Sequence, residues 1–488
     1  EKPRIHWLIW SFLAFGLGML SKENTITFLA VVPLTLWVFT KTSIRTKIYA
    51  EIPLVAATLL FLIVRINISG LPGGEAPDNI MNNPFADMSG SERYATTFYT
   101  LLLYLKLLFF PHPLTVDYYP YHIPVINWAD IRAILPLLIY LALLVYAVIL
   151  IFRKSIVAYS ILFYLVTLSI VSNLFFSIGT FMSERFLFMP SLGFAIFSGY
   201  VLLVALPAQA PVKKYNRPLL YTAFTALFIM LAFFGTKAII RNNQWEDDYT
   251  LFSHDVKIST NSAFGNKSLG NHLIEEALET NNTKQKEQYL SKALKHLHKA
   301  VKINPDYTKA LFLLGNAEYL YAKNFKENHN NFERAFHYYG ELLNRDPDHE
   351  EAYENIAVIL NNVKDPQFRL KIWKDLYQLN SDRFEVNYQL GILYRDHQQN
   401  YELAIKHLRK ALEKRPGHAS ALMNLGVAYA NKGNWNAAEN YHLEAIAKGM
   451  KDAGVYRNLQ VIYQQLGQEE KAAEFGQKAQ KMQQSKEN

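Results

Sequence analysis

Apolar segments of nearly membrane-spanning length dominate the first half of the chain and restrict the folds open to it. A helix needs about 20 apolar residues to cross a bilayer, and seven segments approach that length or form short apolar helices. They are residues 48–66, 131–152, 155–176, 187–206 and 219–239, with shorter segments at 7–20 and 25–39. We therefore predict a transmembrane helical domain over residues 1–240 with about seven crossings.

Charge divides the chain at the same place. Residues 1–240 contain 17 of the 50 Lys and Arg residues and 10 of the 42 Asp and Glu residues, so most of the net charge of +8 lies in the apolar half. Basic residues in short membrane loops explain this excess without a nucleic-acid partner. The absence of cysteine excludes disulfide frameworks, thiolate zinc sites and cysteine nucleophiles. The composition indicates an integral membrane protein with a soluble part.

Three basic linkers predict the orientation, because Lys and Arg concentrate in cytoplasmic loops. Placing residues 41–47, 153–154 and 213–217 in the cytoplasm puts an external loop, 69–130, and everything after Arg241 on the other side. This parity requires that residues 94–110 do not cross the membrane, as an interfacial or re-entrant helix would not. The alternative places residues 153–154 outside.

A helical repeat begins after the apolar half. The tetratricopeptide repeat (TPR) has about 34 residues and a small residue where its two helices approach closely. That position recurs at Gly270, Gly315, Ala357, Gly391, Gly426 and Gln460. We predict an all-α chain, with a connector at 241–261 and a TPR superhelix of about six repeats at 262–488. Such arrays bind other proteins, and Asn387, Asn424 and Asn458 are candidates to contact a peptide in the groove. The alternative is that these asparagines are solvated or pack between helices.

Charged and aromatic residues at the ends of the apolar segments are the candidate substrate-binding residues. They fall in three loops on the predicted external side: Lys22 and Glu23, Asp117 and Tyr118, and Glu184 and Arg185. Cations suit a lipid phosphate, and a carboxylate suits sugar hydroxyls or a proton. Each residue could instead be a juxtamembrane anchor or part of an internal ion pair. The sequence contains no Gly-rich phosphate loop, zinc signature or Ser-His-Asp arrangement, so no metal ligand is predicted.

Several longer motifs carry a family resemblance. They are LGMLSKENTITFLAVVPLTL, NPFADMSGSERY, YLKLLFFPHPLTVDYYPY and SERFLFMPSLGF, followed by Trp245-Glu246-Asp247 and the repeats. In this order they resemble the transmembrane and tetratricopeptide-repeat (TMTC) family. That family is similar to the protein O-mannosyltransferases of the C-type glycosyltransferase superfamily.

The resemblance implies an enzyme that transfers a sugar from a polyprenyl-phosphate carrier to Ser or Thr of exported proteins, with the TPRs recruiting the acceptor. The superfamily's acidic catalytic motif follows its first membrane helix, and we expect it upstream of Glu1, in a larger protein of which this chain is a part. A divalent metal is possible, and no other cofactor is predicted. The alternative function is a non-catalytic, membrane-anchored TPR scaffold. The expected location is a bacterial inner membrane with the repeats in the periplasm, or the ER membrane with lumenal repeats.

Overall fold

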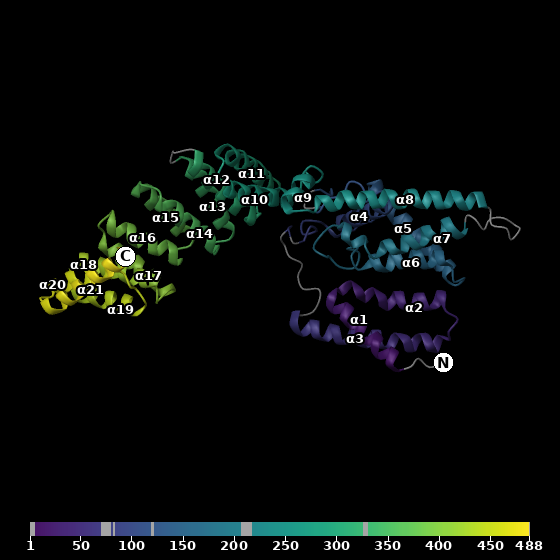
Figure 1. Cartoon of the computed structure of the whole chain (residues 1–488), viewed down its shortest axis with the longest axis horizontal. Coiled ribbons are helices and arrows are strands. Elements are labelled where there is room, and N and C mark those ends of the chain that lie inside the picture. Colours follow the sequence, from purple (N-terminus) through teal and green to yellow (C-terminus); the bar gives the residue numbers. More distant parts are fainter. Residues whose placement is uncertain are drawn as a thin grey trace. The chain divides into compact units, whose positions relative to one another are not determined.

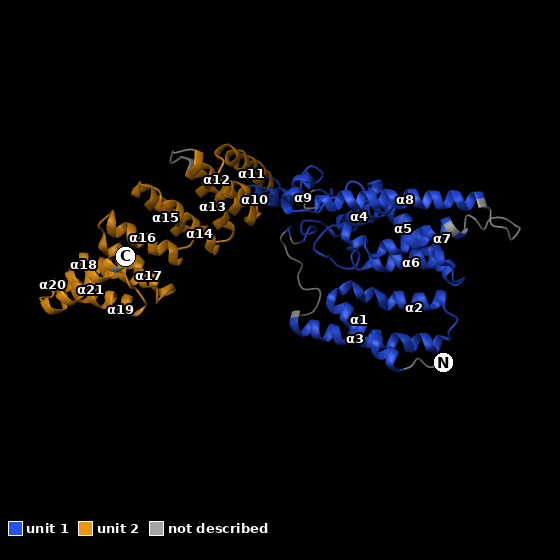
Figure 2. Ribbon diagram, viewed as in Figure 1, with its two compact units in different colours: residues 1–273, 302–305 blue, residues 274–301, 306–488 orange. Residues whose placement is uncertain are grey.

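The computed structural model describes residues 5–69, 80–81, 83–118, 122–205, 217–325 and 330–487. Within these residues the chain is helical and has no β-strand, which confirms the predicted all-α fold. Two compact units can be separated: residues 1–273 with 302–305, and residues 274–301 with 306–488 (Figure 2). This division falls inside one helix, and the domain limits proposed from the sequence stay a prediction.

Unit 1 contains the apolar helices and a short charged segment that follows them (Figure 1). Its elements are α1 (Ile5–Ser21), the 3₁₀ turn η1 (Glu23–Thr27), α2 (Phe28–Phe39), α3 (Ile44–Ser69), α4 (Gly90–Phe109), α5 (Ile131–Ile151), α6 (Ile156–Ser169), the 3₁₀ turn η2 (Glu184–Leu187), α7 (Pro190–Tyr200), the π-helical turn η3 (Val201–Ala205), α8 (Arg217–Gln244), α9 (Asp248–Asp255) and the first part of α10 (Ala263–Glu279). As predicted, a charged turn separates the first two helices.

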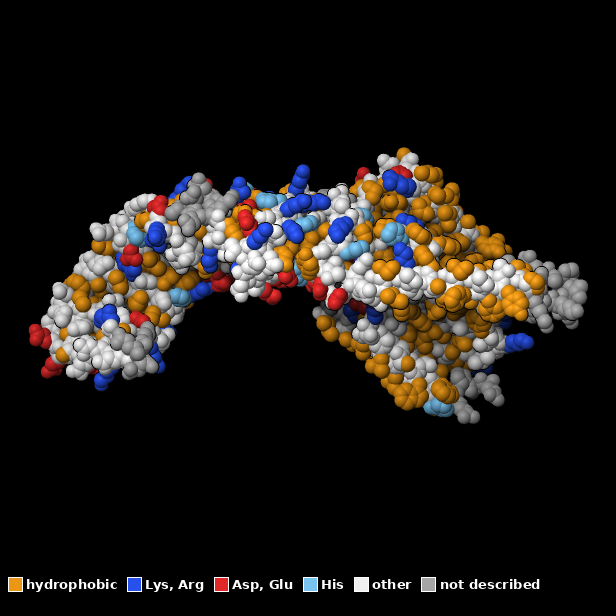
Figure 3. All heavy atoms as spheres, turned by 45° about the horizontal axis from the view of Figure 1, so that its top comes forward, with side chains coloured by type: hydrophobic (Ala, Val, Ile, Leu, Met, Phe, Trp, Pro, Cys, Tyr) orange, Lys and Arg blue, Asp and Glu red, His pale blue; other side chains and the backbone are white. Residues whose placement is uncertain are grey.

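Among the described residues of unit 1, three helices are long and apolar enough to cross a membrane. They are α3, α5 and α8. Shorter apolar helices, α1, α2 and α6, accompany them. Hydrophobic side chains cover much of this unit's visible surface (Figure 3), as lipid-facing helices require. The total of seven crossings stays a prediction.

Two predicted segments are interrupted. Helix α6 ends at Ser169 instead of continuing to residue 176. Asn173 adopts a left-handed φ of 60°, and its side-chain amide donates to the carbonyls of Thr180 and Phe181 at 2.9 and 3.0 Å. These bonds close a loop where the sequence predicted helix. The segment 187–206 is also divided, because Pro190 occupies the first turn of α7 and begins a separate helix.

Helix α4 is buried along one face and begins with a capping box. The Ser89 side chain accepts from the backbone N–H of Glu92, and Glu92 accepts from the N–H of Ser89. Its buried face includes Ala95, Thr100 and Tyr104. This packing against the rest of unit 1 fits a helix that does not cross alone.

Unit 2 is the repeat array. After the end of α10, its helices are α11 (Thr283–Ile303), α12 (Thr308–Phe325), α13 (Asn330–Arg345), α14 (Glu350–Asn361), α15 (Pro366–Leu379), α16 (Phe384–Asp396), α17 (Tyr401–Lys414), α18 (Ala419–Asn431), α19 (Trp435–Ala447), α20 (Ala453–Gln465) and α21 (Glu469–Glu487). Successive helices pack in pairs, such as α16 with α17 and α18 with α19.

The small repeat residues lie where the sequence placed them. A Cβ added at Gly391 would lie 2.5 Å from Leu408 Cγ, and one at Gly315 would lie 2.8 Å from the Tyr339 ring. In the last helix pair, α20 and α21, the glycine is on the second helix and the larger residue on the first, since Gln460 faces Gly476. At Gly315 and Gly391 the partner helices therefore approach too closely for a side chain.

Candidate functional site

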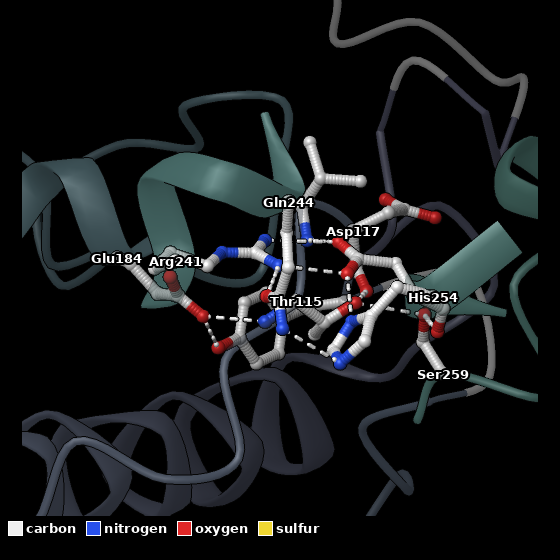
Figure 4. Close-up of polar contacts among 10 residues, drawn as sticks. Thr115, Asp117, Glu184, Arg241, Gln244, His254 and Ser259 are labelled. Carbon is white, nitrogen blue, oxygen red and sulfur yellow. Dashed lines mark hydrogen bonds and ion pairs between the residues drawn. The ribbon is translucent and has the colours of Figure 1, made fainter. Parts of the chain in front are cut away.

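Four consecutive residues after α4, Thr115 to Tyr118, form hydrogen bonds with several other segments of unit 1 (Figure 4). We call these four residues the strap. Glu184, at the start of η2, holds one side of it. Its Oε1 accepts from the Thr115 N–H at 2.6 Å and from the Tyr118 hydroxyl at 2.8 Å. The predicted external loop 69–130 and the loop that contains Glu184 and Arg185 therefore meet at one carboxylate.

The environment of Glu184 makes its ionisation less favourable than in water. Burial raises the pKa of Glu184, and the hydrogen bonds from Tyr118 and Thr115 offset only part of that effect. Burial, reinforced by the negative charge of Glu184, also raises the pKa of the Tyr118 phenol. The second carboxylate oxygen, Oε2, accepts from no residue in the described part of the chain. Glu184 thus anchors the strap with one oxygen and has the other available.

Asp255, at the end of α9, holds the other side of the strap. Its Oδ2 accepts from the Val116 N–H at 2.6 Å. Arg241 binds both oxygens of Asp255, at 2.8 and 2.9 Å, and the Asp255 side chain is only 2% exposed. Burial alone would raise the pKa of Asp255, but hydrogen bonds from Arg241 and His254 hold it below its usual range.

Gln244 and His254 complete a closed ring with this ion pair. Arg241 donates to Gln244 Oε1 at 2.9 Å, which leaves the amide nitrogen of Gln244 facing His254 Nε2 at 3.0 Å. An amide nitrogen can only donate, so Nε2 of His254 accepts and its Nδ1 carries the proton. That proton is donated to Asp255 Oδ1 across 2.9 Å. The ring fixes the direction of every hydrogen bond in it.

Two serines after α9 bind the remaining strap residues. Ser259 donates to the Asp255 carbonyl at 3.0 Å, and its hydroxyl lies 2.9 Å from the Thr115 hydroxyl, within hydrogen-bond distance. Ser262 donates to Asp117 and accepts from the N–H of Gly265 at 2.7 Å, capping α10. Residues 241–261, which were predicted to be a connector, therefore pack as part of unit 1.

The structure brings together some of the predicted residues and separates others. Asp117, Tyr118 and Glu184 belong to the strap and its contacts. Lys22 and Glu23 do not pair with each other, because Glu23 binds Arg65 of α3 at 2.6 Å. Glu23 thus forms an internal ion pair with another helix, because the turn directs its side chain toward α3.

Arg185 lies next to Glu184 but outside the hydrogen-bonded network. It is exposed, its guanidinium lies 5.4 Å from the centre of the Phe186 ring, and it forms no ion pair with a described residue. Lys22 is likewise exposed and unpaired within the described chain. Both cations remain available to an anion.

Sequence reasoning missed Arg241 and Asp255, which organise the site. Both occur where the last apolar helix gives way to a charged segment, and that was the only signal available. Nothing in their spacing distinguishes them from neighbouring charges. No group of three or more His, Asp or Glu in the described residues is arranged to hold a metal ion.

The three candidate groove asparagines differ in their surroundings. Asn387 is fully buried, donates to two backbone carbonyls and pairs with His407 at 2.9 Å, so it has a packing role. Asn424 accepts from Arg395 at 2.7 Å and donates to the Tyr388 hydroxyl at 3.1 Å. Asn458 is half-buried, and its side chain has no partner among described residues.

Comparison with family models matches both halves of the chain. Residues 76–144, which contain α4 and the strap, match the model described as protein O-mannosyl-transferase TMTC, DUF1736. Residues 388–454 match a tetratricopeptide repeat model, and residues 268–383 match a model of the plant-specific mitochondrial import receptor subunit TOM20.

Curated relatives match over most of the chain. The human protein O-mannosyl-transferase TMTC3 is 24% identical over 467 residues, covering 84% of this chain and 48% of that protein. Human protein O-mannosyl-transferase TMTC2 is 37% identical over 103 residues, covering 21% and 11%. The chain thus spans about half the length, or less, of the curated relatives it matches. These matches confirm the resemblance found in the sequence.

Solved structures overlap with the repeats only loosely. The crystal structure of YrrB, described as a TPR protein with an unusual peptide-binding site, covers 41% of this chain and 92% of its own at 20% identity, with a TM-score of 0.29.

Proposed function

We propose that the chain functions in a C-type membrane glycosyltransferase. It would take a sugar from a polyprenyl-phosphate donor and pass it to Ser or Thr of a protein recruited by the repeats, in the periplasm or the ER lumen. The relatives named as protein O-mannosyl-transferases support this class of activity. The match of residues 76–144, which include the strap, ties that support to the site.

The observation that carries the proposal is the difference between Glu184 and Arg185. Glu184 is fixed through one oxygen and has the other free to accept from a sugar hydroxyl. Arg185 follows directly and has no carboxylate partner among the described residues, so its guanidinium can bind two phosphate oxygens. A sugar phosphate contains both hydroxyl groups and phosphate oxygens, and Glu184 and Arg185 together supply a partner for each.

The transfer step exchanges one bond at the sugar's anomeric carbon. The bond to the phosphate oxygen breaks, the bond to the Ser or Thr oxygen forms, and polyprenyl phosphate leaves. The hydroxyl proton passes to a base, a role we assign to no residue of this chain. In this scheme Arg185 stabilises the charge left on the phosphate, and Glu184 orients the sugar.

Substituting Arg185 tests the proposal. Arg185→Ala should abolish glycosylation of Ser and Thr on exported proteins and weaken binding of a polyprenyl-phosphate sugar to the purified chain. Arg185→Lys should restore part of both, because an ammonium supplies charge without the planar pair of donors. Transfer is measured by mass spectrometry of exported proteins, and donor binding by titration in detergent.

Arg132→Ala is the matched control, since Arg132 is a half-exposed arginine already paired with Asp130. It should leave transfer and donor binding unchanged. Normal transfer and binding in both Arg185 variants would refute the phosphate role. Loss of the variant protein from the membrane would identify Arg185 as a structural residue instead.

A membrane-anchored scaffold is the second candidate function. It is favoured by the strap, whose polar groups are largely occupied by other parts of the protein. A scaffold would hold partner proteins on the repeats without binding a lipid-linked sugar. The donor titration separates the two functions.

A further inference from the structure

An apolar groove lies between α4, α5, α6 and α7. It has a volume of about 470 Å³, which lies within the usual range of ligand pockets. Its walls are formed by leucine, isoleucine and phenylalanine side chains from all four helices, together with Lys106, Ser160, Tyr164 and Gly193. A groove of this composition suits a hydrocarbon chain.

Close helix packing fixes the floor of the groove. A Cβ at Gly193 would lie 2.6 Å from the Ser160 carbonyl and 3.0 Å from the Tyr164 nitrogen, so α7 lies directly against α6. Two of the polar lining residues are satisfied within the protein. The Ser160 hydroxyl donates to Ile156 at 2.9 Å, and the Tyr164 hydroxyl bonds to Tyr140 at 2.6 Å.

Lys106 is different, because its ammonium has no ion pair or hydrogen bond with any residue in the described ranges. It lies in the last turn of α4 and is exposed to the groove. The opposite wall includes Ile139 and Leu143 of α5. These residues lie roughly 12 and 18 Å along that membrane-length helix from its start, at 1.5 Å per residue.

An ammonium without a protein partner beside an apolar groove is unfavourable unless an anion or the membrane surface compensates it. The lysine stem can extend along apolar surface towards water, and that alone would make Lys106 an anchor. The groove beside it offers a second possibility. An amphipathic molecule could place its phosphate on the ammonium and its tail in the groove.

The groove also adjoins the proposed site. Its α7 wall begins shortly after η2, the turn that contains Glu184 and Arg185. On the α4 side, the Tyr104 hydroxyl accepts from the Ser183 N–H at 3.1 Å. Tyr104 lies two residues before Lys106 in the chain, and Ser183 lies one residue before Glu184. This hydrogen bond holds α4 against the segment that leads into η2, the turn that contains Glu184 and Arg185.

We propose that this groove holds the isoprenoid tail of the donor lipid and that Lys106 binds its phosphate together with Arg185. This inference rests on the proposed function, because a polyprenyl phosphate is the anionic lipid which that function requires. It adds a binding site for the tail and a second cation for the headgroup.

Photocrosslinking of the full chain in nanodiscs tests the site. The probe is a polyprenyl phosphate with a diazirine in its tail, and the labelled peptides are identified by mass spectrometry. Labels should appear in α5 and α7. Lys106→Gln, which removes the ammonium, should reduce labelling about tenfold, the effect of losing roughly one charge-assisted hydrogen bond. Leu143→Trp, which fills part of the groove, should also reduce labelling.

Two variants serve as controls. Leu138→Trp adds the same ring to α5 at an exposed position outside the groove, and Lys106→Arg retains the charge; both should label normally. Unlabelled polyprenyl phosphate should compete, whereas the corresponding polyprenol and phosphatidylglycerol should compete weakly.

Equal competition by phosphatidylglycerol would make this an ordinary lipid site and overturn the inference. Full labelling of Lys106→Gln would remove the headgroup role. Labelling confined to other helices would refute the groove while leaving the proposed donor intact. A chain that takes up no label anywhere would contradict the proposed function itself.

Discussion

Arg241 and Asp255 form the most buried ion pair found among the described residues of unit 1, with side chains 10% and 2% exposed. Arg241→Ala would leave the Asp255 carboxylate buried without its guanidinium, which we expect to destabilise unit 1 by about 3–5 kcal/mol. Thermal unfolding of the full chain in detergent measures this. Arg132→Ala breaks an exposed Arg–Asp pair and should change stability by only about 0–1 kcal/mol. Equal losses of stability in the two variants would contradict a stabilising role for the buried Arg241–Asp255 ion pair.

Glu184 should make the stability of unit 1 depend on pH. Because its pKa is raised in the folded protein, its contribution is most favourable below the unfolded pKa, about 4.3 for a glutamate, and is lost as the pH rises through the folded value. Glu184→Gln keeps an acceptor oxygen and cannot ionise. The variant should therefore gain stability relative to the natural chain as the pH rises above about 4.3 through the raised folded pKa of Glu184.

Glu92 provides the control for this pH series. Its hydrogen bonds with Ser89 lower its pKa, so its contribution is present above the unfolded pKa and is lost as the pH falls. Unfolding midpoints measured across the pH series should give opposite slopes for Glu184→Gln and Glu92→Gln, each relative to the natural chain. A pH-independent difference for Glu184→Gln would show that this carboxyl is not perturbed.

Among the helices, two glycines of the repeat array should respond to alanine with opposite signs. Gly391 of α16 lies against Leu408, so Gly391→Ala forces the helices apart and should destabilise the array by about 1–3 kcal/mol. Gly340, within α13, has no atom within 4 Å of the added Cβ. Gly340→Ala should therefore stabilise α13 by up to about 1 kcal/mol through helix propensity.

Amide hydrogen exchange in the full chain can follow both substitutions, because it reports the opening of individual helices. Exchange should accelerate in α16 and α17 for Gly391→Ala and slow in α13 for Gly340→Ala. Acceleration in both variants would mean that the two positions are equally close to their neighbours.

For the whole molecule, the predicted orientation places the repeats and the loop between α2 and α3 on opposite sides of the membrane. The natural chain has no cysteine, so single cysteines can be introduced at the exposed residues Lys41 and Lys451. In intact cells or right-side-out vesicles, a membrane-impermeant maleimide should label only Lys451→Cys. Detergent should make both sites reactive. Labelling of both before detergent is added would refute the orientation and the external position of the strap.

The sequence alone was sufficient for the properties that depend on periodic patterns. The run 131–152 predicted a membrane-length helix, and α5 is that helix. The spacing of Gly315, Gly391 and Gly426 predicted the helix pairs of the array, because only a missing side chain permits such close approach. Periodic burial and close packing leave a repeated signature in the residues themselves.

The tertiary structure alone decided which charged groups meet. Lys22 and Glu23 are adjacent in sequence, yet Glu23 binds Arg65, whereas Val116 and Asp255 are 139 residues apart and share a hydrogen bond. Competing ion pairs differ by only a few kcal/mol, and nothing local selects among them. The choice follows from where the packed helices place each side chain, which also leaves Arg185 and Lys106 unpaired within the described residues and Glu184 divided between the strap and a free oxygen.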